Sequence, residues 1–230
     1  MVRSAGNATI KSKVDQRRES IEKLLAAALR LFVTLGYNAT NLEKVAGAAG
    51  LTKGAVYFYF GSKEALLVEV LKHVRTVVLD GAIEAMNGAG PGCSDKIVAF
   101  LHHAANLSLT HRDEVFLLIL MSLEFKEREG EIRTTLDNIY DRLHKLIERV
   151  VRAGQRNGEF RSDLKPRELS AFVMATHDGT FLEWYRRPEA LKDKELVRVH
   201  RAVVVAGMHH AAASLTQVRP RKRAAGERGR

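Results

Sequence analysis

Residues 40–66 read TNLEKVAGAAGLTKGAVYFYFGSKEAL, a pattern that predicts two short helices, a glycine turn and the start of a third helix. Thr40 and Glu43 have the T-x-x-E spacing of a capping box, so we expect Thr40 to cap the first short helix. Gly50 stands where the turn needs a positive φ, and Thr52 is a suitable N-cap for the second helix. This is the layout of a helix-turn-helix, whose second helix enters the major groove of DNA.

The residue types of the second short helix suit close approach to DNA. Gly54 and Ala55 have little bulk to hold the helix away from base edges. Lys53 supplies a cation for phosphate or guanine, and Tyr57 carries a hydroxyl on a stiff arm. The alternative interpretation is a small helical hairpin with an aromatic core, and the helix pattern alone leaves both open.

The longer run at residues 36–67, GYNATNLEKVAGAAGLTKGAVYFYFGSKEALL, resembles the DNA-binding signature of the TetR/AcrR family of bacterial transcriptional regulators. The match includes the Gly-Tyr pair, Val-Ala, the Ala-Gly-Leu turn, Lys-Gly, Tyr-x-Tyr-Phe and Ser-Lys-Glu. The rest of the chain matches only in its helical layout. The resemblance implies an N-terminal helix-turn-helix domain and a C-terminal helical domain for effector binding and dimerisation.

We therefore expect the second short helix to contact double-stranded DNA, while Val45, Val56 and Phe60 hold the unit together. Arg17 lies next to a basic N-terminal arm, and Lys63 stands at a helix N-terminus where a phosphate could bind. The candidate DNA-binding residues are Arg17, Thr40, Thr52, Lys53, Gly54, Ala55, Tyr57, Phe58, Tyr59 and Lys63.

The positive charge of the chain is concentrated at its two ends. The formal net charge is +10, and residues 1–20 and 217–230 account for most of it. Basic ends on a nearly balanced body fit a polyanionic partner, although they could also serve only solubility. We expect residues 1–14 to form a flexible basic arm and residues 217–230 a disordered basic tail.

Other functional classes find little support in the sequence. Cys93 is the single cysteine, so a disulfide framework and a cysteine metal cluster are excluded. The N-terminus lacks an apolar leader region, and the longest apolar run, residues 115–121, is too short to span a bilayer. Phosphate-loop, metalloprotease and serine-hydrolase motifs are lacking. We expect a cytoplasmic protein that is not an enzyme, with no cofactor, no metal and no membrane association.

Hydrophobic periodicity predicts an all-α chain of about nine helices, without strands. A DNA-binding domain is expected at residues 15–62, with its helix-turn-helix motif at 41–60, and an effector-binding and dimerisation domain at residues 63–216. The expected helices outside the two short ones lie near residues 15–35, 62–86, 94–110, 113–128, 131–156, 166–187 and 192–214.

The last two expected helices carry apolar stripes and small residues, which favour a two-fold four-helix interface between two copies. Burial within one chain is the alternative explanation for part of each stripe. The candidate dimer residues are Phe172, Thr176, Gly179, Val199, Val203, Gly207 and His210. A dimer would read a pseudo-palindromic operator with half-sites about 34 Å apart.

The resemblance implies a small-molecule effector among the helices of the second domain, and mixed apolar and polar side chains there could line its pocket. Core packing explains most of these residues equally well. They are Phe100, His103, Leu107, Phe116, Leu120, Tyr140, His144, His177 and Trp184. We expect a homodimeric repressor released by an apolar or aromatic ligand. The alternative is an effector-independent DNA-binding protein of the same fold that recruits a protein partner.

Overall fold

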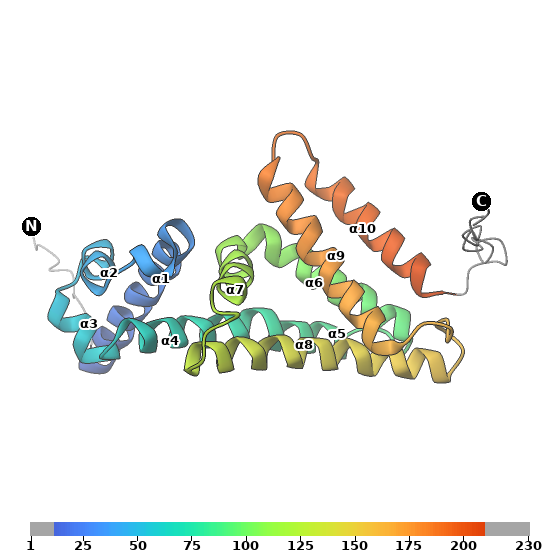
Figure 1. The fold of residues 1–230 in the computed structure, drawn as a ribbon, viewed down its shortest axis with the longest axis horizontal. Helices are drawn as coiled ribbons and strands as arrows, with labels where there is room; N and C mark the ends of the chain where they lie inside the picture. The colour runs from blue at the N-terminus through green and yellow to red at the C-terminus, as the bar shows by residue number, and fades with distance from the viewer. Residues whose placement is uncertain (1–11, 210–230) are drawn as a thin grey trace, which may run out of the picture.

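The computed structural model describes residues 12–209, and this part of the chain is all-α, as the periodicity predicts (Figure 1). A π-helical turn, η1, joins α4 and α5 into one continuous helix, so the described residues form nine helices. The elements are α1 (Lys13–Ala39), α2 (Leu42–Ala49), α3 (Lys53–Phe60), α4 (Lys63–Arg75), η1 (Thr76–Asp80), α5 (Gly81–Asn87), α6 (Cys93–Thr110), α7 (Arg112–Glu124), α8 (Glu131–Arg156), α9 (Pro166–Arg186) and α10 (Asp193–Met208).

The helices α1, α2 and α3 gather at one end of the molecule and form a head (Figure 1). The continuous helix α4–η1–α5 leaves this head and runs along α8, and α6 and α7 cover it. The helices α9 and α10 form a hairpin that stands away from the long helices at its loop end (Figure 1). We call the part from α4 onward the body.

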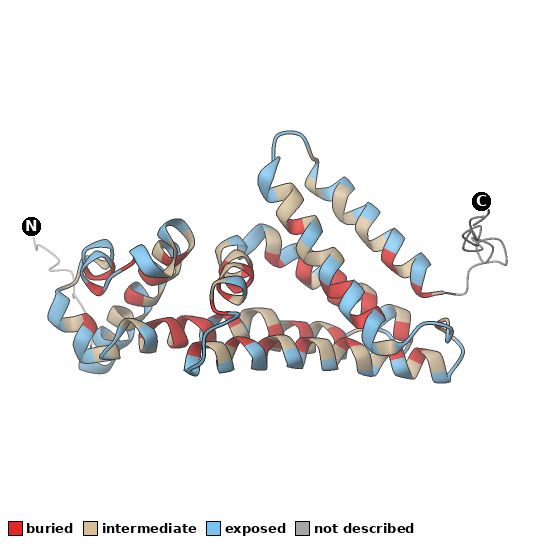
Figure 2. Ribbon diagram, in the orientation of Figure 1, coloured by how far each residue is buried: buried red, intermediate tan, exposed pale blue. Residues whose placement is uncertain are grey.

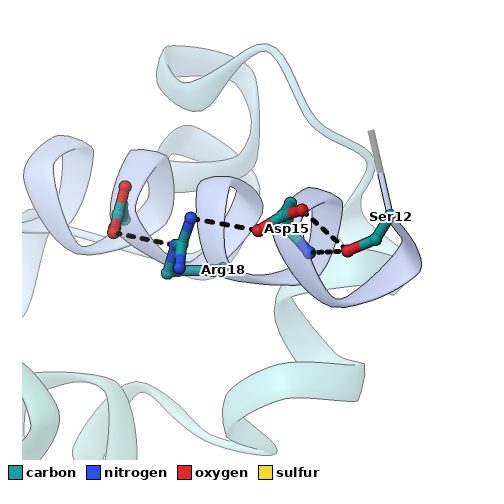
Figure 3. Close-up of polar contacts among 4 residues, drawn as sticks. Ser12, Asp15 and Arg18 are labelled. Carbon is teal, nitrogen blue, oxygen red and sulfur yellow. Dashed lines mark hydrogen bonds and ion pairs between the residues drawn. The ribbon is translucent and has the colours of Figure 1, made fainter. Parts of the chain in front are cut away.

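Helix α1 begins two residues earlier than expected, because Ser12 provides its N-cap (Figure 3). The Ser12 hydroxyl accepts a hydrogen bond from the Asp15 amide at 3.1 Å and donates one to the Asp15 carboxylate at 2.7 Å. At its other end the helix breaks at Gly36, directly after the expected end at residue 35, and Gly36 has φ 76°, which is typical of a C-cap glycine. Most of the expected arm, residues 1–11, lies outside the described residues, as do His210 and the expected tail.

One hydrophobic core runs through both parts of the molecule. Leu24, Ala28 and Phe32 of α1 are fully buried and belong to the same cluster as Leu66, Leu71 and the inner face of α8 (Figure 2). The head is therefore packed against the start of α4 rather than tethered by a linker.

The turn η1 was not predicted by the periodicity, which shows a single helix across residues 62–86. A π-helical turn adds a residue to the helical ladder and commonly occurs at functional positions. The next residue, Gly81, is crossed closely by His103 of α6. A Cβ atom at Gly81 would lie 2.6 Å from Cε1 of His103, so any larger residue there would force the His103 ring to move.

Helix α7 ends at Glu124, four residues earlier than expected. Phe125 is buried and packs edge-on against Tyr37 of the head, with ring centroids 4.9 Å apart, so the chain turns there. Within residues 12–209 we find no helix with the length and apolar character that crossing a bilayer requires.

Candidate DNA-binding and ligand-binding sites

The cap of α2 is formed by Asn41, and the predicted capping role of Thr40 is wrong. The Asn41 side chain accepts a hydrogen bond from the Lys44 amide at 2.8 Å. Thr40 is 1% exposed and donates its hydroxyl to the carbonyls of Leu31 and Gly36, at 3.1 and 2.8 Å. These two hydrogen bonds hold the Thr40 hydroxyl inward, so its side chain does not reach the surface that could face DNA.

The turn between α2 and α3 follows the sequence prediction. Gly50 adopts φ 67°, and the Thr52 side chain accepts a hydrogen bond from the Ala55 amide at 3.2 Å. Val45 and Val56 are fully buried and Phe60 is half-buried, so they hold the two short helices to the shared core of the head. The helix-turn-helix geometry is therefore fixed from inside the head.

The outer face of α3 is apolar and unpartnered. Phe58 is 79% exposed and Tyr57 is 48% exposed, and Gly54 leaves the start of the helix open (Figure 2). Ala55 and Tyr59 are half-buried. Exposed aromatic side chains of this size on a short helix indicate a surface that binds another molecule.

Lys53 is held by an acidic neighbour on α2. Its ammonium forms an ion pair with Glu43 and lies 5.8 Å from the centroid of the Tyr57 ring. The hydrogen bond between the two side chains raises the pKa of Lys53 and lowers the pKa of Glu43. A phosphate that approaches α3 must compete with Glu43 for this cation.

Two other candidate cations have different surroundings. Arg17 is exposed on the first turns of α1, whereas its neighbour Arg18 lies between Asp15 and Glu22 (Figure 3). Lys63 is half-buried, donates to the Tyr37 carbonyl at 2.8 Å and lies 4.1 Å from the centroid of that ring. Lys63 therefore ties the start of α4 to the end of α1, and two of its three N–H donors remain for another acceptor.

The body encloses a small cavity of about 30 Å³ between η1, α6, α7, α8 and α9. Five of the nine predicted pocket residues line it. They are Phe100, His103, Leu107, Tyr140 and His177. This volume holds one or two water molecules, so a larger ligand must push the surrounding helices apart.

Of the four titratable side chains that line this cavity, burial favours the uncharged form of His103, His177 and Tyr140 at neutral pH, and Asp178 is the exception. Burial lowers the pKa of His177 to about 4 and also lowers the pKa of His103. The Nε2 atom of His103 is buried without a hydrogen-bond partner. Burial raises the pKa of Tyr140, and it raises the pKa of Asp178 to about 6, so at neutral pH Asp178 is the charged group of the lining.

The remaining predicted pocket residues lie elsewhere. Trp184 lines a second small cavity of about 40 Å³ with His200, and His177 borders both cavities. Phe116 stacks on Tyr185 with ring centroids 4.5 Å apart. Leu120 packs on the main core, and neither it nor His144 lines either cavity. Helical periodicity places Phe116, Leu120 and His144 on helices of the body, but it does not tell which face of each helix meets a cavity.

Sequence reasoning missed Asn41 and Asp178. Asn41 was overlooked because Thr40 satisfies the capping-box spacing one residue earlier, although asparagine is a stronger N-cap than threonine. Asp178 stands beside His177 within an apolar stripe of α9, and an acid at such a position is a signal for a functional pocket.

The hairpin of α9 and α10 presents an apolar face to the outside. Phe172 is 50% exposed, Val199 51% and Val203 60%, and Gly179 and Gly207 are also exposed there. Thr176 is half-buried and hydrogen-bonds His200 at 3.1 Å. A groove of about 560 Å³ opens on the same hairpin between Leu169, Phe172 and Met208. Five of the predicted dimer residues therefore lie on an open surface.

A helix-turn-helix with an exposed second helix, packed on a helical body that encloses an apolar cavity with a few polar groups, defines a DNA-binding regulator with a sensory domain. Comparisons with known proteins agree. The family model for bacterial regulatory proteins of the tetR family matches residues 24–70, and the model for the C-terminal part of BetI-type transcriptional repressors matches residues 101–209.

Among solved structures, the MbdR regulator from Azoarcus sp. CIB is 40% identical, with a TM-score of 0.74 over 82% of this chain and 98% of that one. The chain belongs to the TetR family of bacterial regulatory proteins and is a DNA-binding transcriptional regulator.

Two more distant structures share the fold and were solved with ligands. FadR from Bacillus subtilis, in complex with stearoyl-CoA, is 21% identical with a TM-score of 0.68 over 82% of this chain and 99% of that one. A regulator from Saccharomonospora viridis, in complex with choline, is 20% identical with a TM-score of 0.73 over 84% of this chain and 100% of that one. The same fold thus holds ligands of very different chemistry.

Proposed function

We propose that the protein is a homodimeric, cytoplasmic repressor that leaves a pseudo-palindromic operator when a small ligand enters its body. The observation that carries this proposal is the continuous helix α4–η1–α5. It begins against the head at Lys63 and contributes Val78 to the wall of the cavity. A rigid element shared by two sites is what coupling between them requires.

The operator contact is assigned to the outer face of α3. Tyr57, Phe58 and Gly54 are exposed, and Lys53 is within reach of a phosphate once it separates from Glu43. Asn41 replaces Thr40 among the candidates, because it is exposed at the N-terminus of α2, where free amides favour an anion.

The apolar hairpin face is assigned to a second copy of the chain. One helix-turn-helix reads few bases, and a two-fold dimer places the second α3 about 34 Å away, one DNA turn along. Replacing Val203 by glutamate should convert dimers into monomers, because an unpaired charge would be buried at the interface. Light scattering reports the mass, with Leu123→Glu, at an exposed leucine on α7, as the control. A dimer that persists in Val203→Glu would place the interface elsewhere.

The ligand that suits the cavity is apolar or aromatic and carries one polar group. The ionised carboxylate of Asp178 favours a ligand that donates an N–H or O–H and disfavours a free carboxylate. Entry of such a ligand must displace at least one of the surrounding helices, η1 among them, because the cavity is too small otherwise. Movement of η1 would shift α4 and change the distance between the two α3 helices, provided that the ligand prefers the shifted conformation.

The proposal assigns no reaction to the protein, because no catalytic motif occurs in the sequence. The other candidate function, an effector-independent DNA-binding protein that recruits a protein partner, is favoured only by the small volume of the cavity.

The deciding experiment selects bound sites from genomic DNA and then screens metabolites for release of the enriched operator. We expect a palindromic site and release by an apolar or aromatic compound. Operator binding that no compound alters would favour the effector-independent alternative. Failure to bind any duplex at low salt would overturn both.

A further inference from the structure

A basic groove of about 520 Å³ lies between η1, α5 and the middle of α8, apart from the two small cavities and the hairpin face. Arg142, Lys145, Arg149 and Arg152 line it from α8. Their spacing places them along one side of the helix. Cations on a helix are ordinarily spread over a convex, solvated surface, whereas these four border a hollow.

The floor of the groove is apolar. Leu79 of η1 is fully buried, and Ile83 of α5 and Leu146 of α8 are half-buried. A hollow with an apolar floor and a charged rim suits a ligand with one flat apolar part and one strongly anionic part.

The positive charge of the rim is only partly paired within residues 12–209, since Lys145 lies 4.0 Å from the Asp141 carboxylate and Arg152 pairs with Glu148. Glu148 is the one carboxylate of the lining, and it is engaged by the guanidinium of Arg152 at 3.0 Å. Among residues 12–209, no ion pair involves Arg142 or Arg149. Arginine presents a planar fork of N–H donors that matches two phosphate oxygens, and two such forks on one rim can hold a diphosphate.

We propose that this groove binds the polyphosphate-bearing nucleoside head group of a ligand, with its base on the leucine and isoleucine floor and its phosphates on Arg142 and Arg149. Adenosine nucleotides and coenzyme A share this head group. The volume of the groove lies within the range of small-molecule sites, roughly 300–1,000 Å³. The site is distinct from the cavity of the proposed function and does not depend on it.

The position of the groove connects it to that cavity. On η1, Val78 lines the cavity and the next residue, Leu79, lines the groove. On α8, Leu143 lines the cavity and its neighbour Arg142 lines the groove. The two hollows are therefore opposite sides of one wall made by η1 and α8. A head group held in the groove lies against η1, the segment that continues α4 toward the head.

The test measures binding of ATP, coenzyme A and inorganic tripolyphosphate to the full-length protein by isothermal titration calorimetry at low salt. We expect ATP or coenzyme A to bind more tightly than tripolyphosphate, and the tighter of the two identifies the source of the head group. Arg142→Gln/Arg149→Gln should weaken that binding at least about tenfold, since two charge-assisted contacts are lost. The control is the double variant Arg167→Gln/Arg186→Gln, which changes the net charge by the same amount at two exposed arginines outside the groove.

Several outcomes would overturn the proposal. These are no binding by wild type, equal affinity for tripolyphosphate and the nucleotides, or equal losses in the groove and control variants. Circular dichroism checks the fold of both, and Lys145→Gln, at a highly exposed side chain, is a milder groove variant. If the groove variant lost affinity for operator DNA but not for nucleotides, the groove would be a DNA contact and the assignment would be wrong.

Discussion

The head and the body depart from ordinary burial in opposite ways. On the head, Phe58 and Tyr57 are large aromatic side chains left in solvent. In the body, Asp178, His177 and the Nε2 atom of His103 are polar groups withdrawn from solvent, and this nitrogen has no hydrogen-bond partner. The exposed rings contribute little burial energy to the isolated chain, and the withdrawn polar groups cost stability, so a bound molecule that covers the rings or pairs the polar groups would be favoured.

The difference teaches how each region finds its partner. The head offers a preformed convex surface, so DNA can bind with little change in the protein. The body offers a nearly closed cavity of about 30 Å³, so a ligand can enter only by moving helices. A binding event that requires movement is suited to regulation, whereas one that requires none is suited to recognition.

The strongest test of this contrast removes the recognition surface. We expect Lys53→Ala/Tyr57→Ala to lower operator affinity at least about a hundredfold, or about 3 kcal/mol, because a phosphate or base contact from each side chain is lost. Because both side chains are exposed, the melting temperature should stay unchanged. Fluorescence anisotropy with the selected operator measures the affinity, and Lys72→Ala on α4 is the control. Unchanged affinity would show that α3 is not the recognition helix.

A second test concerns the half-buried neighbours Asp178 and His177 in the body. The folded pKa of Asp178, about 6, is raised, so its desolvated carboxylate makes stability fall as pH rises from about 4 to 6. The folded pKa of His177, about 4, is depressed, so the cost of protonating it makes stability rise with pH over a similar window. His103 and His200 lie close enough to act on His177, and both are disfavoured in the charged form.

The two effects oppose each other, each being worth about 3 kcal/mol at most. We therefore expect Asp178→Asn to stabilise the protein at pH 7.5 more than at pH 4, and His177→Gln to change stability in the opposite direction, raising it at pH 4 relative to pH 7.5. Urea denaturation at the two pH values, with each variant compared with wild type, measures the difference. An equal effect at both pH values would mean that these groups are not desolvated in the folded protein.

The same contrast explains what the sequence could predict. The head is built from local signals, including Gly50 and Thr52, and both have the predicted turn or cap role. The error at Thr40 arose because capping was judged from spacing, while the break at Gly36 turned its hydroxyl inward. In the body, hydrophobic periodicity predicted where the helices begin and end. It could not distinguish a residue that lines a pocket from one that packs in the core, because both recur at the same helical spacing. Tyr140 and Phe116 could not be separated until the helices were placed, and η1 leaves no trace in the pattern.

Lys63 joins the two regions and provides the most delicate test. Its ammonium holds the Tyr37 carbonyl and ring, next to Phe125 at the end of α7. Lys63→Met keeps the apolar stem and removes the donor, so we expect a loss of about 1 kcal/mol in unfolding free energy. If its spare donors also bind a phosphate, the slope of log affinity against log salt should fall by about one per protomer.

These two readouts separate the two roles of Lys63. A normal salt slope combined with reduced stability would assign it to the tie between head and body alone, and a reduced slope would add the DNA contact that the sequence predicts. The matched control is Lys72→Met on the same helix, because Lys72 is exposed and pairs only with Glu69 among the described residues. Stability and salt slope that both match this control would show that the start of α4 is not held to α1 by its lysine. The coupling between cavity and operator would then depend on apolar packing of α4 alone.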